Sequence, residues 1–139
     1  MAFEWKPALS VGVNDIDDQH KELFARVNKL LDATSQGKGK EEIGKIIDFL
    51  GAYVVTHFGT EEKYMLRLQY PHLSSHKAQH QQFLSEFSAL KERFEKEGAT
   101  SQLVILIQRR VCDWLMTHIG GTDKMLGSFL QTRSAAAYR

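Results

Sequence analysis

Apolar residues recur at steps of three and four along four long stretches of this chain, and this spacing limits the folds open to it. Residues three and four apart share one face of an α-helix, so each stretch predicts an amphipathic helix. The expected helices open near residues 14, 40, 72 and 101 and stop at "QGKGK", "YP", Gly98 and "GG", respectively. Only two prolines occur, and no stretch alternates as a strand would. The chain is therefore expected to be all-α.

Helices of this length, joined by short connections, favour an antiparallel up-down-up-down four-helix bundle. A chain of 139 residues fits one domain, which we expect to span residues 1–139. Residues 1–13 carry Trp5 and Pro7 and predict an extended N-terminal arm packed on the bundle. Residues 131–139 have little apolar pattern and predict a frayed tail.

Charge and composition argue against several classes of partner. The formal net charge is +1 and the basic residues are scattered, which is unlike a protein that binds nucleic acid or an anionic membrane. The longest apolar run, residues 103–107, is far too short to span a membrane. The single cysteine, Cys112, excludes an intramolecular disulfide and fits a reducing compartment. We expect a cytoplasmic monomer, with an unidentified protein partner left open.

Histidine lies on the inner face of all four predicted helices. One buried imidazole is usually just hydrogen-bonded to the backbone. Several imidazoles and a carboxylate buried together without strong partners would cost several kcal/mol, roughly. A metal centre supplies such partners. The inward-facing set is His20, His57, Glu61, His76, His80 and His118.

The spacing of these residues is that of chelating pairs. His57 and Glu61 are four apart, as are His76 and His80, so each pair can reach one interior point. His118 and Asp123 are five apart, which separates them by about 140° on a regular α-helix. Two glycines, at 120 and 121, lie between them. We expect the helix to break or loosen there and return Asp123 to the centre, although a plain C-terminal cap is also consistent.

The donor set limits the choice of metal. Seven ligands are too many for one tetrahedral zinc and thiolates are absent, so two nearly octahedral ions sharing carboxylates are the economical solution. Imidazole with carboxylate suits iron. Neither HExxH nor the Glu-x-x-His repeat of ferritin-like diiron proteins occurs in the chain.

Four segments, "IDDQH", "HFGTE", "HKAQH" and "WLMTHIGGTD", together resemble the hemerythrins, in particular the single-domain bacterial kind. The match extends from the arm at Trp5 to about Lys124. The resemblance implies two iron ions per chain (Fe2+/Fe3+) joined by an oxo or hydroxo bridge. By the same resemblance, one iron takes His76, His80 and His118, the other takes His20 and His57, and Glu61 and Asp123 bridge them.

The unequal ligand count leaves an open position on the iron with two imidazoles, where dioxygen is expected to bind. A dry apolar lining would hinder loss of the bound oxygen as peroxide. The candidates for this O2 pocket are Phe58, Trp114, Leu115 and Ile119.

Reversible dioxygen binding, for storage, delivery or scavenging, is therefore the leading functional hypothesis, and it makes the chain a binding protein rather than an enzyme. One alternative is an O2 or redox sensor that acts through a partner or is part of a longer signalling protein. A diiron enzyme acting on peroxide or nitric oxide ranks lower, because no acid–base pair or substrate cleft is evident.

Overall fold

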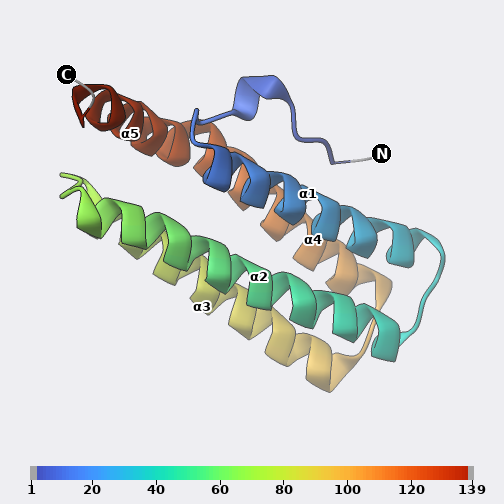
Figure 1. The fold of residues 1–139 in the computed structure, drawn as a ribbon. Helices are drawn as coiled ribbons and strands as arrows, with labels where there is room; N and C mark the ends of the chain where they lie inside the picture. Colours follow the sequence, from blue (N-terminus) through green and yellow to red (C-terminus); the bar gives the residue numbers. More distant parts are fainter. Residues whose placement is uncertain (1–2, 138–139) are drawn as a thin grey trace.

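The computed structural model describes residues 3–137 and consists of helices joined by short connections (Figure 1). Four long helices run antiparallel, in the up-down-up-down order that the periodicity predicts. No strand occurs within the described residues. The elements are η1 (Pro7–Leu9), α1 (Asn14–Ser35), α2 (Lys40–Arg67), α3 (Leu73–Glu97), α4 (Ser101–Thr117), a π-helix η2 (His118–Asp123) and α5 (Lys124–Ala137).

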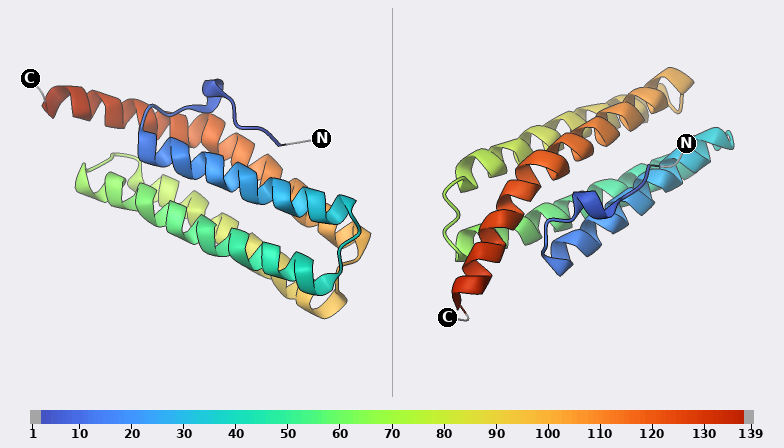
Figure 2. Two further views of the ribbon diagram at one scale, coloured as in Figure 1. Left: turned by 45° about the vertical axis from the view of Figure 1, so that its right-hand side comes forward. Right: turned by 90° about the horizontal axis from the view of Figure 1, so that it is seen from above.

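Local sequence signals set the ends of these helices. The hydroxyl of Thr100 accepts a hydrogen bond from the backbone N–H of Leu103 and caps the start of α4. Gly98 adopts a φ of 83° directly after α3, a left-handed conformation that favours glycine. Each long helix packs against two neighbours: α1 contacts α2 and α4, and α3 contacts the same two helices from the opposite corner of the bundle (Figure 2). The predicted bundle topology is confirmed.

The N-terminal arm lies against α1 and α5, as expected. Buried Asp17 in the first turn of α1 accepts hydrogen bonds from the backbone N–H of Val11 and from the hydroxyl of Ser10. On the other side, Gln131 of α5 donates to the carbonyl oxygen of Val11 at 2.9 Å. The arm thus connects the start of the first helix to the last one.

The fourth helix does not stop at its glycines. It widens into the π-helix and continues as α5, which runs to Ala137 and so through most of the segment for which we expected fraying. Buried Leu126 and Leu130 attach α5 to the bundle, an apolar pattern that ends where the sequence turns polar. Residues 138 and 139 lie outside the described residues.

The apolar interior is divided into two clusters. The larger one fills the bundle between α1, α2, α3 and α4 and includes Leu23, Val54, Phe83 and Leu115. The smaller one closes the end of the bundle beneath the arm and α5, and consists of Val11, Ile16, Met65, Tyr70, Leu126 and Leu130.

Ile47 is fully buried in α2 and Ile46 is partly buried, because the buried face of that helix is wider than a single row of residues. Within the described part of the chain, no helix is both long enough and apolar enough to cross a membrane.

Candidate metal centre

A layer of polar side chains separates the two apolar clusters. Each long helix contributes to it at the point where its apolar face changes from one cluster to the other. On α1, for example, His20 lies between Ile16 of the small cluster and Leu23 of the large one. The whole layer is at most 2 % exposed and consists of His20, His57, Glu61, His76, His80, His118 and Asp123. The structure therefore brings together all seven predicted ligands.

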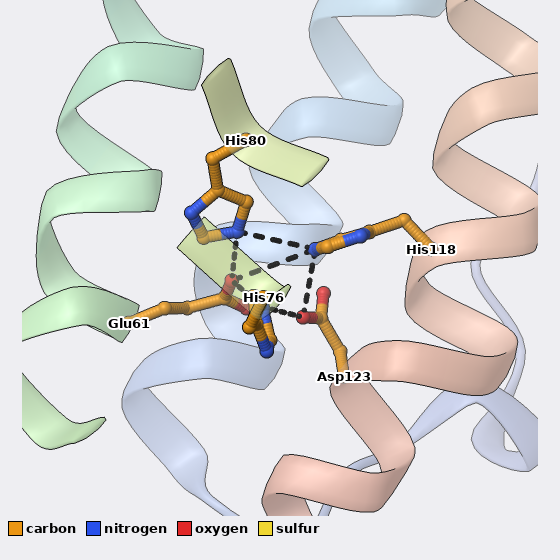
Figure 3. Close-up of side chains that lie close together, drawn as sticks. All are labelled: Glu61, His76, His80, His118 and Asp123. Atoms are coloured by element: carbon orange, nitrogen blue, oxygen red, sulfur yellow. Dashed lines mark hydrogen bonds and ion pairs between the residues drawn. The ribbon is translucent and has the colours of Figure 1, made fainter. Parts of the chain in front are cut away.

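Glu61 lies at the middle of the layer. Its Oε1 is 3.0 Å from Nε2 of His80 and 3.2 Å from Nε2 of His76. Its Oε2 is 3.2 Å from Nε2 of His57 and 3.5 Å from Nε2 of His20. One carboxylate thus faces imidazoles of three helices with both of its oxygens, and Figure 3 shows its approach to His76 and His80.

Asp123 completes the layer from the opposite side. Its Oδ1 is 3.1 Å from Nε2 of both His76 and His118, and its Oδ2 is 3.0 Å from Nε2 of His20. The π-helix makes this possible, because hydrogen bonds from i to i+5 place residues five apart about one turn apart. The helix therefore loosens between His118 and Asp123, as expected, but does not break.

The donors of this layer fall into two groups with shared members. Glu61, His76, His80, His118 and Asp123 form one group, whose ligand atoms all lie within 4.8 Å of one another. His20, His57, Glu61 and Asp123 form the other. Each group could hold one metal ion, and the two carboxylates belong to both.

Several of these buried atoms face one another without making hydrogen bonds. Nε2 of His20 and His57, Oε2 of Glu61 and both oxygens of Asp123 have no hydrogen-bond partner among the described residues. Burying such groups unpaired is costly. Nε2 of His80 and Nε2 of His118 are 3.2 Å apart, close to the separation of about 3 Å for two nitrogens bound to one metal at about 2.1 Å and a right angle. The positions of these donors therefore fit bound metal ions better than a closed network of hydrogen bonds.

The charges of the layer are tightly linked. Burial alone would lower the pKa of His20 and His76, but the carboxylates of Asp123 and Glu61 outweigh it and raise each pKa to about 9. Burial and the charge of Glu61 would raise the pKa of Asp123, yet the facing imidazoles of His118, His20 and His76 lower it to about 2. The pKa of Glu61 is likewise held well below its usual range, against burial, by His57, His118 and His20. Protons thus compete with metal for these nitrogens.

Three side chains outside the predicted set orient the imidazoles. Oε1 of Gln19 lies 2.7 Å from Nδ1 of His57, and Oε1 of Gln79 lies 2.9 Å from Nδ1 of His118. Oε2 of Glu62 lies 3.0 Å from Nδ1 of His80. Because each of these oxygens accepts a hydrogen bond from Nδ1–H, the lone pair of Nε2 is directed toward the centre, as a ligand requires.

These three residues were not predicted from the sequence, although their positions carry a signal. Gln19, Glu62 and Gln79 are each adjacent in sequence to a member of the layer, and each holds an imidazole of a neighbouring helix. A polar residue next to a ligand projects from the flank of its helix, toward the next one. Only the packing of the helices decides which imidazole it meets.

The four residues expected to line the O2 pocket are all beside the layer. Phe58 stacks on the ring of His80, with centroids 3.8 Å apart, and Trp114 stacks on His118 at 4.2 Å. Leu115 and Ile119 are fully buried in the large apolar cluster. The remaining histidine, His72, is exposed and belongs to neither donor group.

Comparison with known proteins agrees with this geometry. Residues 11–130 match the family model described as the hemerythrin HHE cation binding domain. The chain is 38 % identical over 128 residues to a bacteriohemerythrin of Methylococcus capsulatus, covering 91 % of this chain and 95 % of that protein. It is 34 % identical over 120 residues to a bacteriohemerythrin of Pseudomonas aeruginosa, covering 86 % and 75 %.

Solved structures show the same fold. A crystal structure of wild-type hemerythrin superposes with a TM-score of 0.82 at 36 % identity, covering 91 % of this chain and 96 % of that one. A mutant of hemerythrin with leucine replaced by alanine gives a TM-score of 0.84, with 94 % and 98 % covered. With the family model, the relatives and the fold in agreement, the chain belongs to the hemerythrin family.

Proposed function

We propose that this chain binds dioxygen reversibly at a non-haem diiron centre and serves O2 storage, delivery or scavenging. The observation that carries the proposal is the pair of buried donor groups that share Glu61 and Asp123. Two groups with two carboxylates in common suit two metal ions held side by side and bridged. The family membership of the chain supports iron as the metal.

Each residue of the layer has a defined task in this proposal. His76, His80 and His118 would hold one iron, and His20 and His57 the other, with Glu61 and Asp123 bridging them. An oxo or hydroxo bridge would complete the pair. Iron held by these residues would supply the two electrons that dioxygen takes up on binding and returns on release.

The protein contributes an unequal number of imidazoles at the two donor groups and an apolar lining that excludes water. Because one donor group has three imidazoles and the other two, the group with His20 and His57 leaves room for an added ligand. Apolar side chains separate the layer from water, and the buried Leu115 and Ile119 are part of this barrier. Excluding water hinders the proton delivery that would turn bound oxygen into free peroxide.

A binding role is proposed in preference to an enzymatic one, since the layer holds no acid–base pair beyond its own ligands. We further propose that the protein is a cytoplasmic monomer. The thiol of Cys112 is free and half-buried, which suits a reducing compartment.

Iron content and absorption spectra test the proposal. The protein is reduced without air, and its spectrum is recorded before adding O2, after adding it, and after removing it. We expect two irons per chain and a charge-transfer band that appears with O2 and disappears on its removal. An irreversible change would favour a redox sensor or an enzyme, and protein that takes up no iron would overturn the proposal.

A further inference from the structure

The three side chains that accept hydrogen bonds from Nδ1 of the imidazoles, which is the nitrogen facing away from the centre of the layer, differ in charge. Gln19 and Gln79 accept from His57 and His118 through neutral amide oxygens. Glu62 accepts from His80 through a carboxylate. A hydrogen bond to a carboxylate is charge-assisted and roughly twice as strong as one to a neutral acceptor. His80 is therefore the one imidazole of these three with an anionic outer partner.

The placement of Glu62 is set by its neighbour in sequence. On α2, Glu61 points into the layer and Glu62 toward its edge, where its side chain is one quarter exposed. His80 lies between them, with Nε2 3.0 Å from Oε1 of Glu61 and Nδ1 3.0 Å from Oε2 of Glu62. Two consecutive carboxylates thus hold both nitrogens of one imidazole ring.

A carboxylate on Nδ1–H draws the proton toward itself and makes Nε2 a stronger electron donor. Glu62 also pairs with Lys77, whose ammonium lies 4.0 Å from Oε1 and whose side chain is mostly exposed, so it neutralises little of this charge. The extra donation is confined to the donor group with three imidazoles. Within the described residues, neither His20 nor His57 has such an anion on Nδ1.

We propose that Glu62 is a positioning residue that fixes the tautomer of His80 and, through its charge, stabilises Fe3+ over Fe2+ at the iron bound by His76, His80 and His118. This inference rests on the proposed function. It assigns to a residue outside the ligand set control over how readily the centre gives up its electrons, and hence over the affinity for O2 and the rate of autoxidation.

Glu62→Gln separates charge from position, because the amide oxygen still accepts from His80 while the negative charge is gone. Gln79→Glu is the matched opposite, since it adds a carboxylate at Nδ1 of His118 in the same donor group. We expect Glu62→Gln to retain two irons and to shift the Fe3+/Fe2+ equilibrium toward Fe2+ by about threefold or more, and Gln79→Glu to shift it the other way.

A readout without iron or oxygen checks the positioning role. In the Zn2+-loaded protein, nitrogen-15 NMR should show His80 protonated at Nδ1 in wild type and in Glu62→Gln, and Glu62→Ala should bind Zn2+ about 10- to 100-fold more weakly. If Glu62→Ala does not fold, the comparison of Glu62→Gln with Gln79→Glu still tests the inference. Equal potentials in wild type and Glu62→Gln, or shifts of the same sign in Glu62→Gln and Gln79→Glu, would overturn the inference. Failure to bind O2 would overturn only the proposed function, since potential and tautomer are measured without it.

Discussion

Nε2 of His118 lies 3.1 Å from Oδ1 of Asp123, although the two residues are five positions apart in the chain. A regular α-helix would direct their side chains apart by about 140°. The π-helix between them removes this offset and leaves both side chains buried in the same layer. One widened turn therefore delivers the second carboxylate, and several expectations depend on it.

Asp123→Asn tests the bridging role of this carboxylate. The amide is nearly the same size but lacks the charge that both donor groups share, so we expect metal affinity to fall by at least about 100-fold. Metal content after dialysis, followed by titration with Co2+, measures the loss. Asp113→Asn, which removes an exposed carboxylate from α4, is the control and should bind as wild type does. Two ions bound at unchanged affinity in Asp123→Asn would contradict the bridging assignment.

The stability of the metal-free protein should fall as the pH rises. The pKa of His20 and of His76 is about 9 in the folded chain and near 6.5 when unfolded, so their contribution is fully present below pH 6.5 and is lost as the pH passes through 9. We expect the melting temperature to drop by about 4 °C or more between pH 6.5 and 9.5.

In the metal-loaded protein the imidazole nitrogens bind metal instead of protons, so the same decline should be absent. Thermal unfolding followed by circular dichroism, with and without metal, makes the comparison. A flat profile for the metal-free protein would show that these imidazoles are neutral in it.

Leu115→Ala should open the apolar lining next to His118. Removing this fully buried side chain is expected to cost about 2–5 kcal/mol of stability and to speed the autoxidation of the O2 adduct. Val111 lies one turn before Leu115 on α4 and is equally buried, so Val111→Ala is a control for a packing defect farther from the layer. Autoxidation measured at equal folded fraction should rise only in Leu115→Ala. Equal rates in both variants would make Leu115 ordinary core.

Two glycines of the last helices should respond oppositely to alanine. A methyl group at Gly127 would meet the carbonyl oxygen of Val11 at 2.2 Å, so Gly127→Ala must displace the arm. At Gly121 it would meet no atom within 4 Å beyond its chain neighbours and the backbone of its own helix, and alanine there should be neutral or stabilising by up to about 1 kcal/mol. Urea unfolding compares the two. A Gly127→Ala protein as stable as wild type would show that the arm contributes little.

The sequence was sufficient to predict the bundle and the seven inward-facing polar residues, because helical period and ligand spacing are local properties. His57 with Glu61 and His76 with His80 needed only the rise of an α-helix. The relation of His118 to Asp123 could be predicted only as a loosening of the helix, because the glycines do not specify which irregular turn forms. Neither Gly120 nor Gly121 has a positive φ, so the π-turn is set by packing as much as by these residues.

The residues that accept hydrogen bonds from Nδ1 of the histidines could not be predicted, since their roles depend on contacts between helices. In the sequence, Gln79 resembles an ordinary surface residue of α3. In the structure, its Oε1 lies 2.9 Å from Nδ1 of His118, which belongs to η2. Asp17, in the first turn of α1, likewise accepts a hydrogen bond from the backbone of the arm. The continuation of α5 to Ala137 was missed for a similar reason, because the arm to which Gln131 binds lies 120 residues away in sequence.

The division of the interior by the polar layer affects how the protein unfolds. Val11, Ile16, Met65, Tyr70, Leu126 and Leu130 pack on one side of seven titratable groups, and the rest of the core packs on the other. Without metal, imidazoles and carboxylates of different helices face one another at the boundary between these two cores. Metal ions bound in this layer would replace those contacts with bonds to residues of α1, α2, α3 and η2, and we expect the two cores then to unfold as a single cooperative unit.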